Sequence, residues 1–222
     1  LDGEFVKVRS YNHKTGTFMS EVSQRGNQVI LVSGLHSLYP KQLLDVQDVS
    51  FFLEIEEDLR TKLKIERDFQ GRRKDKQKTL EEINKRKSDG KKYIEPQKNN
   101  ADVIFKLSPI NKEKIDSDFP LEKNLKLQVR IRNGAYYHEL LRALIGICDL
   151  QVNIEEFDER GSIELDIQGE VRPEDIRLAS SMIVPHLDEF IEDQAGFEEG
   201  MLGIMQLVTM IEIDQALRNR KR

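Results

Sequence analysis

The stretch Ser50-Phe51-Phe52-Leu53-Glu54-Ile55 decides the expected fold of this chain. It is a short, largely apolar run that leads directly into a helical pattern over residues 57–69, so it predicts a strand followed by a helix. A second helical pattern follows at 76–87, and residues 101–107 predict another strand. Strands that alternate with helices indicate an α/β fold with a parallel sheet.

Upstream of this unit, residues 28–32 form a β-branched apolar run, Gln-Val-Ile-Leu-Val, which ends at Ser33. A continuous apolar run of this length predicts a fully buried strand of the same parallel sheet. Ligands of open α/β sheets bind outside the carboxyl ends of the strands, so His36, in Gly34-Leu35-His36, is a candidate ligand contact. A structural histidine after a strand is at least as common, and the residues alone leave both interpretations open.

The alternation of strands and helices breaks at residues 109–124, which hold Pro109, Pro120 and several charges and therefore predict a linker. Beyond it, residues 125–132 alternate strictly between apolar and polar side chains, which predicts a half-buried strand. The remaining patterns give the order strand, helix, strand, strand, helix, helix. We therefore expect an α/β region at 1–108, a linker at 109–124 and a small α+β domain at 125–222.

The charges of the chain are unevenly distributed. With 40 acidic and 35 basic side chains the net charge is -5, and an acidic protein is a poor general binder of nucleic acid. Basic residues are concentrated at 60–98 and acidic residues at 149–199, which predicts an anionic ligand near the first stretch. RNA is a weaker candidate than a phosphate ligand, because the basic stretch has only Phe69 and Tyr93 as stacking aromatics.

The single cysteine and the hydropathy pattern indicate in which cellular compartment the protein is expected. Cys148 has apolar neighbours, which predicts a buried thiol and excludes an internal disulfide or a cysteine-based zinc site within this chain. This cysteine usage fits a reducing cytoplasm. We find neither a signal peptide nor an apolar run long enough to cross a bilayer, and we expect a cytoplasmic protein.

Residues 201–213 are apolar almost all round the expected helix and are interrupted by Gln206 and Glu212. A helix of this kind is buried on several sides. The core of the second domain is the favoured environment. A subunit interface is the second, and it would make the protein a homo-oligomer through this domain.

Arginines in the basic stretch are candidate phosphate ligands. Residues four apart share a helix face, so Asp68 is expected to pair with Arg72 and to leave Arg67 and Arg73 free to reach outward. The planar guanidinium fork matches the oxygen atoms of a phosphate group. From the charge pattern alone, a solvated, salt-bridged helix face is the favoured alternative.

Four segments occur in an order and spacing that resemble the phosphoribulokinase and uridine kinase family of P-loop kinases. They are Tyr11-Asn12-His13-Lys14-Thr15-Gly16, Ser33-Gly34-Leu35-His36, Lys64-Ile65-Glu66-Arg67-Asp68, and Tyr93-Ile94-Glu95-Pro96-Gln97-Lys98 with Ala101-Asp102-Val103-Ile104. The last is the longest and most specific, and the resemblance covers roughly the first half of the chain. It implies transfer of the ATP γ-phosphate, with Mg²⁺, to a hydroxyl of a sugar phosphate or nucleoside.

The resemblance also implies roles for individual residues, in two groups. One group contacts the acceptor, and the other neutralises phosphate charge from a lid. The implied residues are Tyr11 and His13 for the acceptor, and Arg67 and Arg72 for the phosphates. His36 joins the acceptor candidates because of its place after the expected strand. Arg73, which stands where the family lid has a glycine, joins the phosphate candidates because of its charge. His13 lies in a polar turn, and from its surroundings alone it is more typical of a surface residue.

Two departures from the family pattern leave a second hypothesis open. The chain contains no G-x-x-x-x-G-K-[ST] loop, which would hold the ATP phosphates and is expected upstream of Leu1. Ser33 stands where the family has a magnesium-associated glutamate, so no metal ligand is assigned. The first hypothesis is a kinase seen without its N-terminal part. The second is a catalytically inactive, kinase-like binding or assembly module.

Overall fold

The computed structural model describes residues 5–12, 15–25, 29–72, 75–134, 137–157, 161–184 and 196–220. The chain forms two compact units, Leu1–Ser37 and Leu38–Arg222. The smaller unit holds two antiparallel strand pairs, and the larger one holds a five-stranded sheet with its helices.

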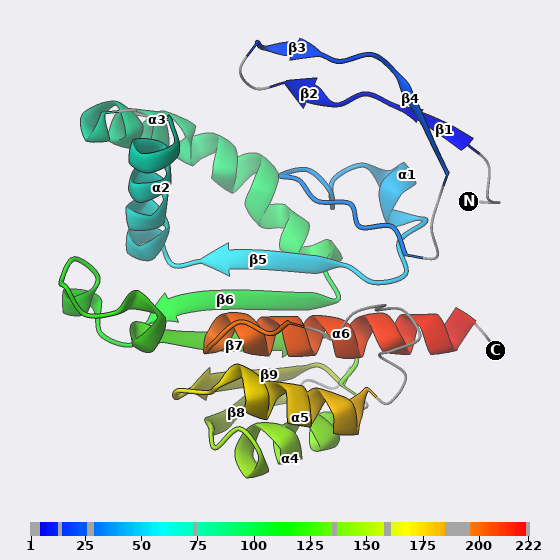
Figure 1. The fold of residues 1–222 in the computed structure, drawn as a ribbon, viewed down its shortest axis with the longest axis vertical. Helices are drawn as coiled ribbons and strands as arrows, with labels where there is room; N and C mark the ends of the chain where they lie inside the picture. The colour runs from blue at the N-terminus through cyan, green and yellow to red at the C-terminus, as the bar shows by residue number, and fades with distance from the viewer. Residues whose placement is uncertain are drawn as a thin grey trace. The chain divides into compact units, whose positions relative to one another are not determined.

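In the smaller unit, β1 (Phe5–Val8) pairs with β4 (Val22–Arg25), and β2 (Tyr11–Asn12) pairs with β3 (Thr17–Phe18). Figure 1 shows these strands as one extended ribbon. The β2–β3 connection includes Gly16 at φ +71°, a left-handed conformation that glycine adopts without steric cost. The polar turn expected around Gly16 is therefore confirmed for the residues described, while the strands on either side were not predicted.

The strand predicted at 28–32 does not form over residues 29–32, and Gln28 lies outside the described residues. Its apolar side chains are exposed, and Leu31 is 80% exposed. A buried strand needs a pairing partner and cover on both faces. Among the described residues no strand pairs with this segment, so the prediction of a strand here is wrong.

The larger unit is built on one mixed sheet. Its strand order is β5 (Phe51–Ile55), β6 (Val103–Pro109), β7 (Leu125–Ile131), β9 (Ile163–Gln168) and β8 (Gln151–Phe157). β5 and β6 are parallel, with Phe51 opposite Val103, and the other three pairings are antiparallel. The predicted α/β class with a parallel pair in its first half is confirmed.

The connection from β5 to β6 is helical, as the sequence predicts. It consists of α2 (Glu57–Arg72), α3 (Lys76–Asp89), a π-helical turn η1 (Gly90–Ile94) and a 3₁₀ segment η2 (Glu95–Asn100). Asp75 caps α3, because its Oδ1 accepts hydrogen bonds from the backbone N–H groups of Gln77 at 2.7 Å and Lys78 at 3.4 Å. Between the smaller unit and β5, the described residues form one short helix, α1 (Lys41–Leu44).

Residues 109–124, the predicted linker, connect two neighbouring strands of the one sheet. They include the 3₁₀ turns η3 (Lys112–Lys114) and η4 (Leu121–Asn124). The buried Asn124 closes this connection, since its side chain accepts from the backbone N–H of Asn111 at 2.9 Å and donates to the Asn111 carbonyl at 2.8 Å. The strands before and after this segment, β6 and β7, are therefore paired in one sheet. A functional division into two domains stays a prediction.

The second half follows the predicted order. After β7 come α4 (Tyr137–Gly146), β8, β9, α5 (Pro173–Ile183) and α6 (Met201–Arg220). Pro173 occupies the first turn of α5, where its missing N–H costs nothing. The expected helical segment before α6 falls partly on residues 185–195, which lie outside the described residues.

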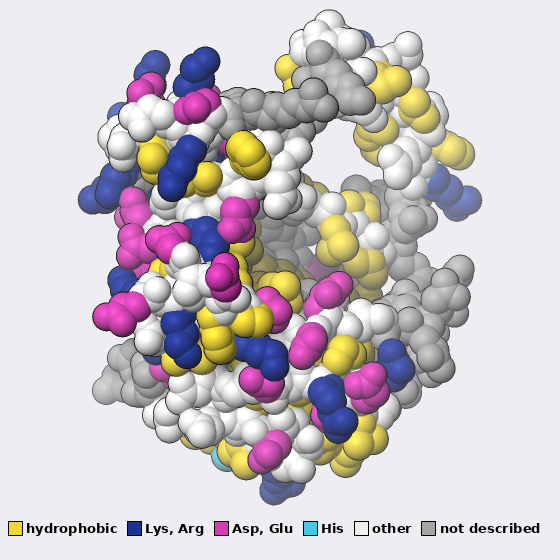
Figure 2. Space-filling view, turned by 60° about the vertical axis from the view of Figure 1, so that its left-hand side comes forward, with side chains coloured by type: hydrophobic (Ala, Val, Ile, Leu, Met, Phe, Trp, Pro, Cys, Tyr) yellow, Lys and Arg dark blue, Asp and Glu magenta, His cyan; other side chains and the backbone are white. Residues whose placement is uncertain are grey.

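The surface of the molecule carries charges of both signs. In Figure 2, lysine and arginine side chains are intermixed with aspartate and glutamate side chains over the face turned to the viewer. Among the helices in the described ranges, none is long and apolar enough to cross a membrane.

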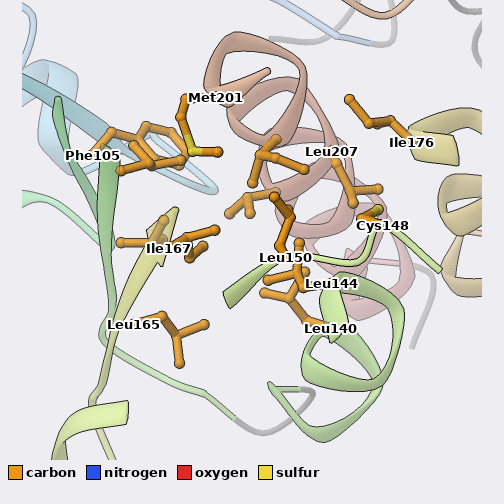
Figure 3. Packing of buried hydrophobic residues seen from close by; sticks show 14 of the residues in the cluster. Phe105, Leu140, Leu144, Cys148, Leu150, Leu165, Ile167, Ile176, Met201 and Leu207 are labelled. Carbon is orange, nitrogen blue, oxygen red and sulfur yellow. The ribbon is translucent and has the colours of Figure 1, made fainter. Parts of the chain in front are cut away.

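The core lies between one face of the sheet and helices α4, α5 and α6 (Figure 1). Alternate residues of β6, β7 and β9 point into it, including Phe105, Leu165 and Ile167, and Figure 3 shows them facing side chains of the helices. Cys148 is part of this cluster, and burial raises the pKa of its thiol to about 11. The prediction of a buried cysteine is confirmed.

α6 approaches its neighbours most closely at Gly203. A Cβ atom at this position would lie 2.1 Å from the carbonyl oxygen of Glu198 and 2.4 Å from Cδ1 of Ile176 in α5. The expected environment of the apolar helix at 201–213, a domain core, is therefore confirmed on this side.

Candidate functional site

A groove of about 130 Å³ lies between α2 and the segment formed by α3 and its continuation. Its lining residues are Glu57, Arg60, Thr61 and Lys64 from α2, Ile83, Arg86 and Lys87 from α3, Gly90 and Lys91 from η1, and Glu95 from η2.

The helical repeat explains why these side chains meet. Glu57, Thr61 and Lys64 are four and three residues apart, so they lie on one face of α2. On the other side Ile83 and Lys87 share a face of α3, and η1 continues the helix with a wider turn that brings Lys91 to the same groove. Single π turns are frequent at functional sites.

The groove carries an excess of positive charge. Five of its side chains are cationic and two are acidic, whereas the whole chain has a net charge of -5. The cations therefore gather at this place against the overall balance. Such a concentration of ammonium and guanidinium groups is the chemistry that binds phosphate oxygens.

Glu57 links the two walls of the groove. Its carboxylate lies 2.9 Å from Nζ of Lys87 on α3 and 3.6 Å from the guanidinium of Arg60 on its own helix. The hydrogen bond from Lys87 holds the pKa of this carboxyl below its ordinary value, and Arg60 acts in the same direction. Both helices are thus tied together at the open end of the groove, although all three side chains are about half exposed.

Lys64 is the half-buried cation of the groove. Burial lowers the pKa of its amino group, Asp68 and Glu82 partly offset this effect, and the nearby guanidinium of Arg86 adds to it. An amino group in this situation gains stability for its charged form when an anion binds beside it. A phosphate group in the groove would supply that negative charge.

The prediction that Arg67 is left free is wrong. Its Nε and one terminal nitrogen donate to Oδ1 of Asp68 at 3.1 and 2.9 Å. The pairing of Asp68 with Arg72 stays a prediction, because the side chain of Arg72 is not described. The Asp68 side chain is only 1% exposed, and a buried carboxylate requires compensation by a cation or by donors. The side chain of Arg67 is 60% exposed and retains further N–H groups, so its role at a phosphate stays a prediction.

Three of the predicted site residues lie outside what the structure describes. Arg72 belongs to the last turn of α2, but its side chain is not among those described, and Arg73 and His13 fall on residues that are not described at all. Their roles at the phosphate or at the acceptor stay predictions.

Tyr11 lies on β2 of the smaller unit. Its ring meets the ring of Phe18 edge-on, with the centroids 5.2 Å apart, and the side chain is 46% exposed. The phenol therefore has one face packed within the hairpin and remains accessible from outside. This arrangement is compatible with contact to an acceptor but does not test it.

His36 lies in a turn that begins at Gly34, not after a strand as the sequence suggested. Both the backbone N–H and the hydroxyl of Ser37 donate to the Gly34 carbonyl, at 3.3 and 3.1 Å. His36 and Ser33 are exposed. The structure places Tyr11 and His36 in the smaller unit and Arg67 in the larger one.

The sequence reading missed most of the groove. It identified residues 60–98 as basic but did not select Arg60, Lys64, Arg86, Lys87 or Lys91. The spacing of Arg60 and Lys64 was a usable signal, since residues four apart share a helix face. The spacing of residues along the sequence does not predict how α2 packs against α3.

The donor set of the groove fits an anion and not a metal ion. Within the described ranges, no group of three or more His, Cys, Asp and Glu side chains is placed to hold a metal. Mg²⁺ prefers carboxylate and phosphate oxygens in a near-octahedral arrangement. The described residues therefore do not form a Mg²⁺ site by themselves.

Comparison with known proteins places these observations in a family. A family model described as the phosphoribulokinase / uridine kinase family matches residues 1–114 of the 222 in the chain. The chain belongs to the phosphoribulokinase / uridine kinase family. All groove residues lie inside the matched segment, so the cationic groove is part of the family region.

Curated members of the phosphoribulokinase / uridine kinase family match the same half of the chain. Phosphoribulokinase of Synechocystis sp. is 36% identical over 107 residues, which are 48% of this chain and 32% of that protein. Uridine kinase of Staphylococcus haemolyticus is 30% identical over 117 residues, which are 52% of this chain and 56% of that protein. The chain thus spans between about a third and just over half of the length of these relatives.

A solved phosphoribulokinase shares the fold over a longer range. The structure of phosphoribulokinase from Rhodobacter spheroides aligns with a TM-score of 0.55 and 18% sequence identity, and it covers 84% of this chain and 68% of that one. This coverage exceeds the 114 residues of the family match, so the likeness of fold reaches into the second half of the chain.

Proposed function

We propose that the protein transfers a phosphate group from ATP to a hydroxyl of a sugar phosphate or nucleoside, and that this chain supplies the cationic groove that holds phosphate. One observation carries the proposal: five cations, with the half-buried Lys64 among them, line a groove inside the family region. The charges are in excess, and a phosphorylated ligand would balance them.

A groove lined by cations is suited to phosphoryl transfer. The transferring group is highly charged, and catalysis rests on positioning and electrostatic stabilisation more than on covalent chemistry by the protein. In this proposal Lys64 neutralises charge on the transferring or acceptor phosphate. Arg60 and Arg86 hold its outer oxygen atoms, because their guanidinium groups can donate two parallel hydrogen bonds.

Further contacts are proposed from the resemblance to the family. Arg67 and Arg72 would add to the lid, and Tyr11 and His13 would contact the acceptor. Arg73 is proposed for the lid because of its charge, and His36 for the acceptor because of its place after Gly34 and Leu35. ATP supplies the γ-phosphate when it is bound. No step is assigned to Mg²⁺, because the described residues do not form a site for it.

The names of the relatives support the acceptor class. Proteins named phosphoribulokinase and uridine kinase both match this chain, which favours a phosphorylated sugar or a nucleoside as acceptor. A cytoplasmic location and a homo-oligomer through the second half stay predictions.

The test is acceptor-dependent turnover by the full-length protein. We expect ADP formation with Mg-ATP only when an acceptor such as ribulose 5-phosphate or uridine is present, with a new phosphate ester visible by ³¹P NMR. Binding of ATP or acceptor in calorimetry without turnover, in the protein and in its Ser33→Glu variant, would instead support the inactive binding module. Turnover restored by Ser33→Glu alone would show an active site altered at that position.

A further inference from the structure

Gln206 and Glu212 interrupt the apolar part of α6, residues 201–213, and they have different environments. Oε1 of Gln206 accepts a hydrogen bond at 2.7 Å from the backbone N–H of Glu198, in the segment that leads into the helix. The carboxylate of Glu212 has no hydrogen bond or ion pair to any other described residue. Gln206 is therefore explained by local structure, and Glu212 is not.

Glu212 lies at a small, mainly apolar hollow where α6 meets the end of β7 and the start of α4. The hollow has a volume of only about 10 Å³, so it offers little room for water around the carboxylate. The lining residues besides Glu212 are Ile131, Asn133, Gly134, Tyr137, Leu140, Val208, Ile211 and Gln215.

The charged groups around this hollow do not compensate Glu212. Asp102, at the start of β6, is itself negative, and it is fixed by hydrogen bonds of 2.9 and 2.6 Å from the backbone N–H and the hydroxyl of Ser50. At the end of β7, the guanidinium of Arg132 donates to the carbonyl of Asn99. On α6 itself, Asp214 is paired with Arg218 at 2.5 Å.

The remaining titratable groups are on α4. Tyr137 lines the hollow and is half-buried, and the ring of the exposed His138 stacks on it with the centroids 3.8 Å apart. Burial raises the pKa of Glu212 to about 7, and the negative charge of Asp102 acts in the same direction. The carboxyl group thus changes its charge in the neutral range.

We propose that Glu212 is a pH-dependent switch that sets how firmly α6 packs against the sheet. The protonated carboxyl fits the apolar hollow as a neutral group. The carboxylate must remain in the hollow without a counter-charge, which weakens the seam between α6, β7 and α4. This inference concerns the second half of the chain and does not depend on the proposed kinase activity.

The direction of the pH effect follows from linkage. Below the ordinary carboxyl pKa of 4.5, Glu212 is protonated in both the folded and the unfolded chain and has no effect. As the pH rises from there to about 7, the unfolded chain releases the proton first, so the folded state loses stability. Above that range the loss is complete and constant.

The experiment compares the full-length protein with its Glu212→Gln variant in urea unfolding between pH 4 and pH 8.5. We expect similar stability near pH 4 and an advantage of the variant that grows between pH 4.5 and pH 7, up to about 300-fold in the unfolding equilibrium constant at pH 8.5. Glu139→Gln, which removes an exposed carboxylate from α4, is the matched control and should show no such trend. A difference that is independent of pH, or equal in both variants, would overturn the proposal.

A second measurement does not depend on any variant. The ¹³C resonance of the Glu212 carboxyl should titrate with a midpoint near 7. Amide exchange in α6, corrected for the intrinsic pH dependence of exchange, should show less protection at pH 8 than at pH 6. A midpoint near 4.5, or equal protection of α6 at both pH values, would contradict the switch.

Discussion

The groove between α2 and α3 and the hollow below α6 both hold a charge that burial disfavours, but they surround it differently. Lys64 has four other cations in the groove with it, next to open solvent. Glu212 has apolar side chains around it and one further carboxylate nearby. Burial shifts the pKa of each group toward its neutral form, downward for the amine and upward for the carboxyl.

Because of this difference, we expect the groove to bind a ligand and the hollow to regulate packing. An accessible surplus of cations is relieved when an anionic ligand arrives, so the groove responds to ligand concentration. A carboxylate in a small, mainly apolar hollow without a counter-charge is relieved by taking up a proton, so the hollow responds to pH. The two responses are carried by separate residues, and each can be removed without touching the other.

The largest expected effect comes from removing the charge of Lys64. In the full-length protein, Lys64→Met should lower kcat/KM by about 100-fold or more, which is the usual cost of deleting one group that stabilises the transition state electrostatically. The measurement is the rate of ADP formation with the acceptor that supports turnover in the assay of the proposed function.

A matched variant on the neighbouring helix controls for loss of charge alone. Lys85 is an exposed residue of α3 that does not line the groove, so Lys85→Met should retain nearly full activity. Equal losses in the two variants would mean that the general positive field matters, and the groove would lose its special role.

A second prediction tests how tightly the α6 side is packed. Gly203→Ala should lower the free energy of unfolding by about 3 kcal/mol, because its methyl group would overlap a backbone carbonyl that cannot move aside easily. Urea unfolding at pH 6, where Glu212 is mostly protonated, isolates the steric effect.

The control for this substitution is another helical glycine. Gly146 ends α4, and a Cβ atom there would have no other heavy atom within 4 Å. Gly146→Ala should be neutral or stabilise by up to about 1 kcal/mol. Comparable destabilisation by both alanines would show that the helices tolerate added volume equally and that α6 is not specially close-packed.

The smallest expected effect concerns Glu57, which bridges the groove walls. Because its pKa is lowered in the folded state, its contribution is present above pH 4.5 and disappears as the pH falls through the folded pKa. The side chains are half exposed, so Glu57→Gln should cost only about 0.5 kcal/mol of unfolding free energy at neutral pH. The cost should vanish at pH 3 and in 1 M salt. A cost that persists in high salt would contradict an electrostatic origin.

Apolar runs and periodicity predicted the strands of the larger unit and its helices from α2 onward, but not the short α1. The segments at 51–55, 103–109 and 125–131 have one face in the core. The apolar residues on that face can be recognised in the sequence. β1 and β4 carry no such pattern because their side chains are exposed on both faces. The wrong prediction of a strand at 29–32 has another cause. A strand also needs a neighbouring strand to pair with, and hydropathy does not show whether that strand exists.

The candidate site was predicted only in part for a similar reason. Net charge marked the region 60–98 as basic, but the side chains that meet are chosen by how α2 packs on α3. Arg67 illustrates the limit: its long side chain folds back onto the adjacent Asp68, a contact that helix spacing does not favour.

The mixed sheet also bears on the order in which the molecule folds. β8 and β9 pair antiparallel between residues 6 to 17 positions apart, and β7 and β9 between residues 32 to 42 apart. β5 and β6 pair between residues 52 positions apart, across the whole α2–α3 crossover. Contacts between distant residues are entropically costly and form slowly. We expect the antiparallel half to provide the folding nucleus and the parallel pair to join late. The groove is then among the last features to assemble, on a sheet that is already in place.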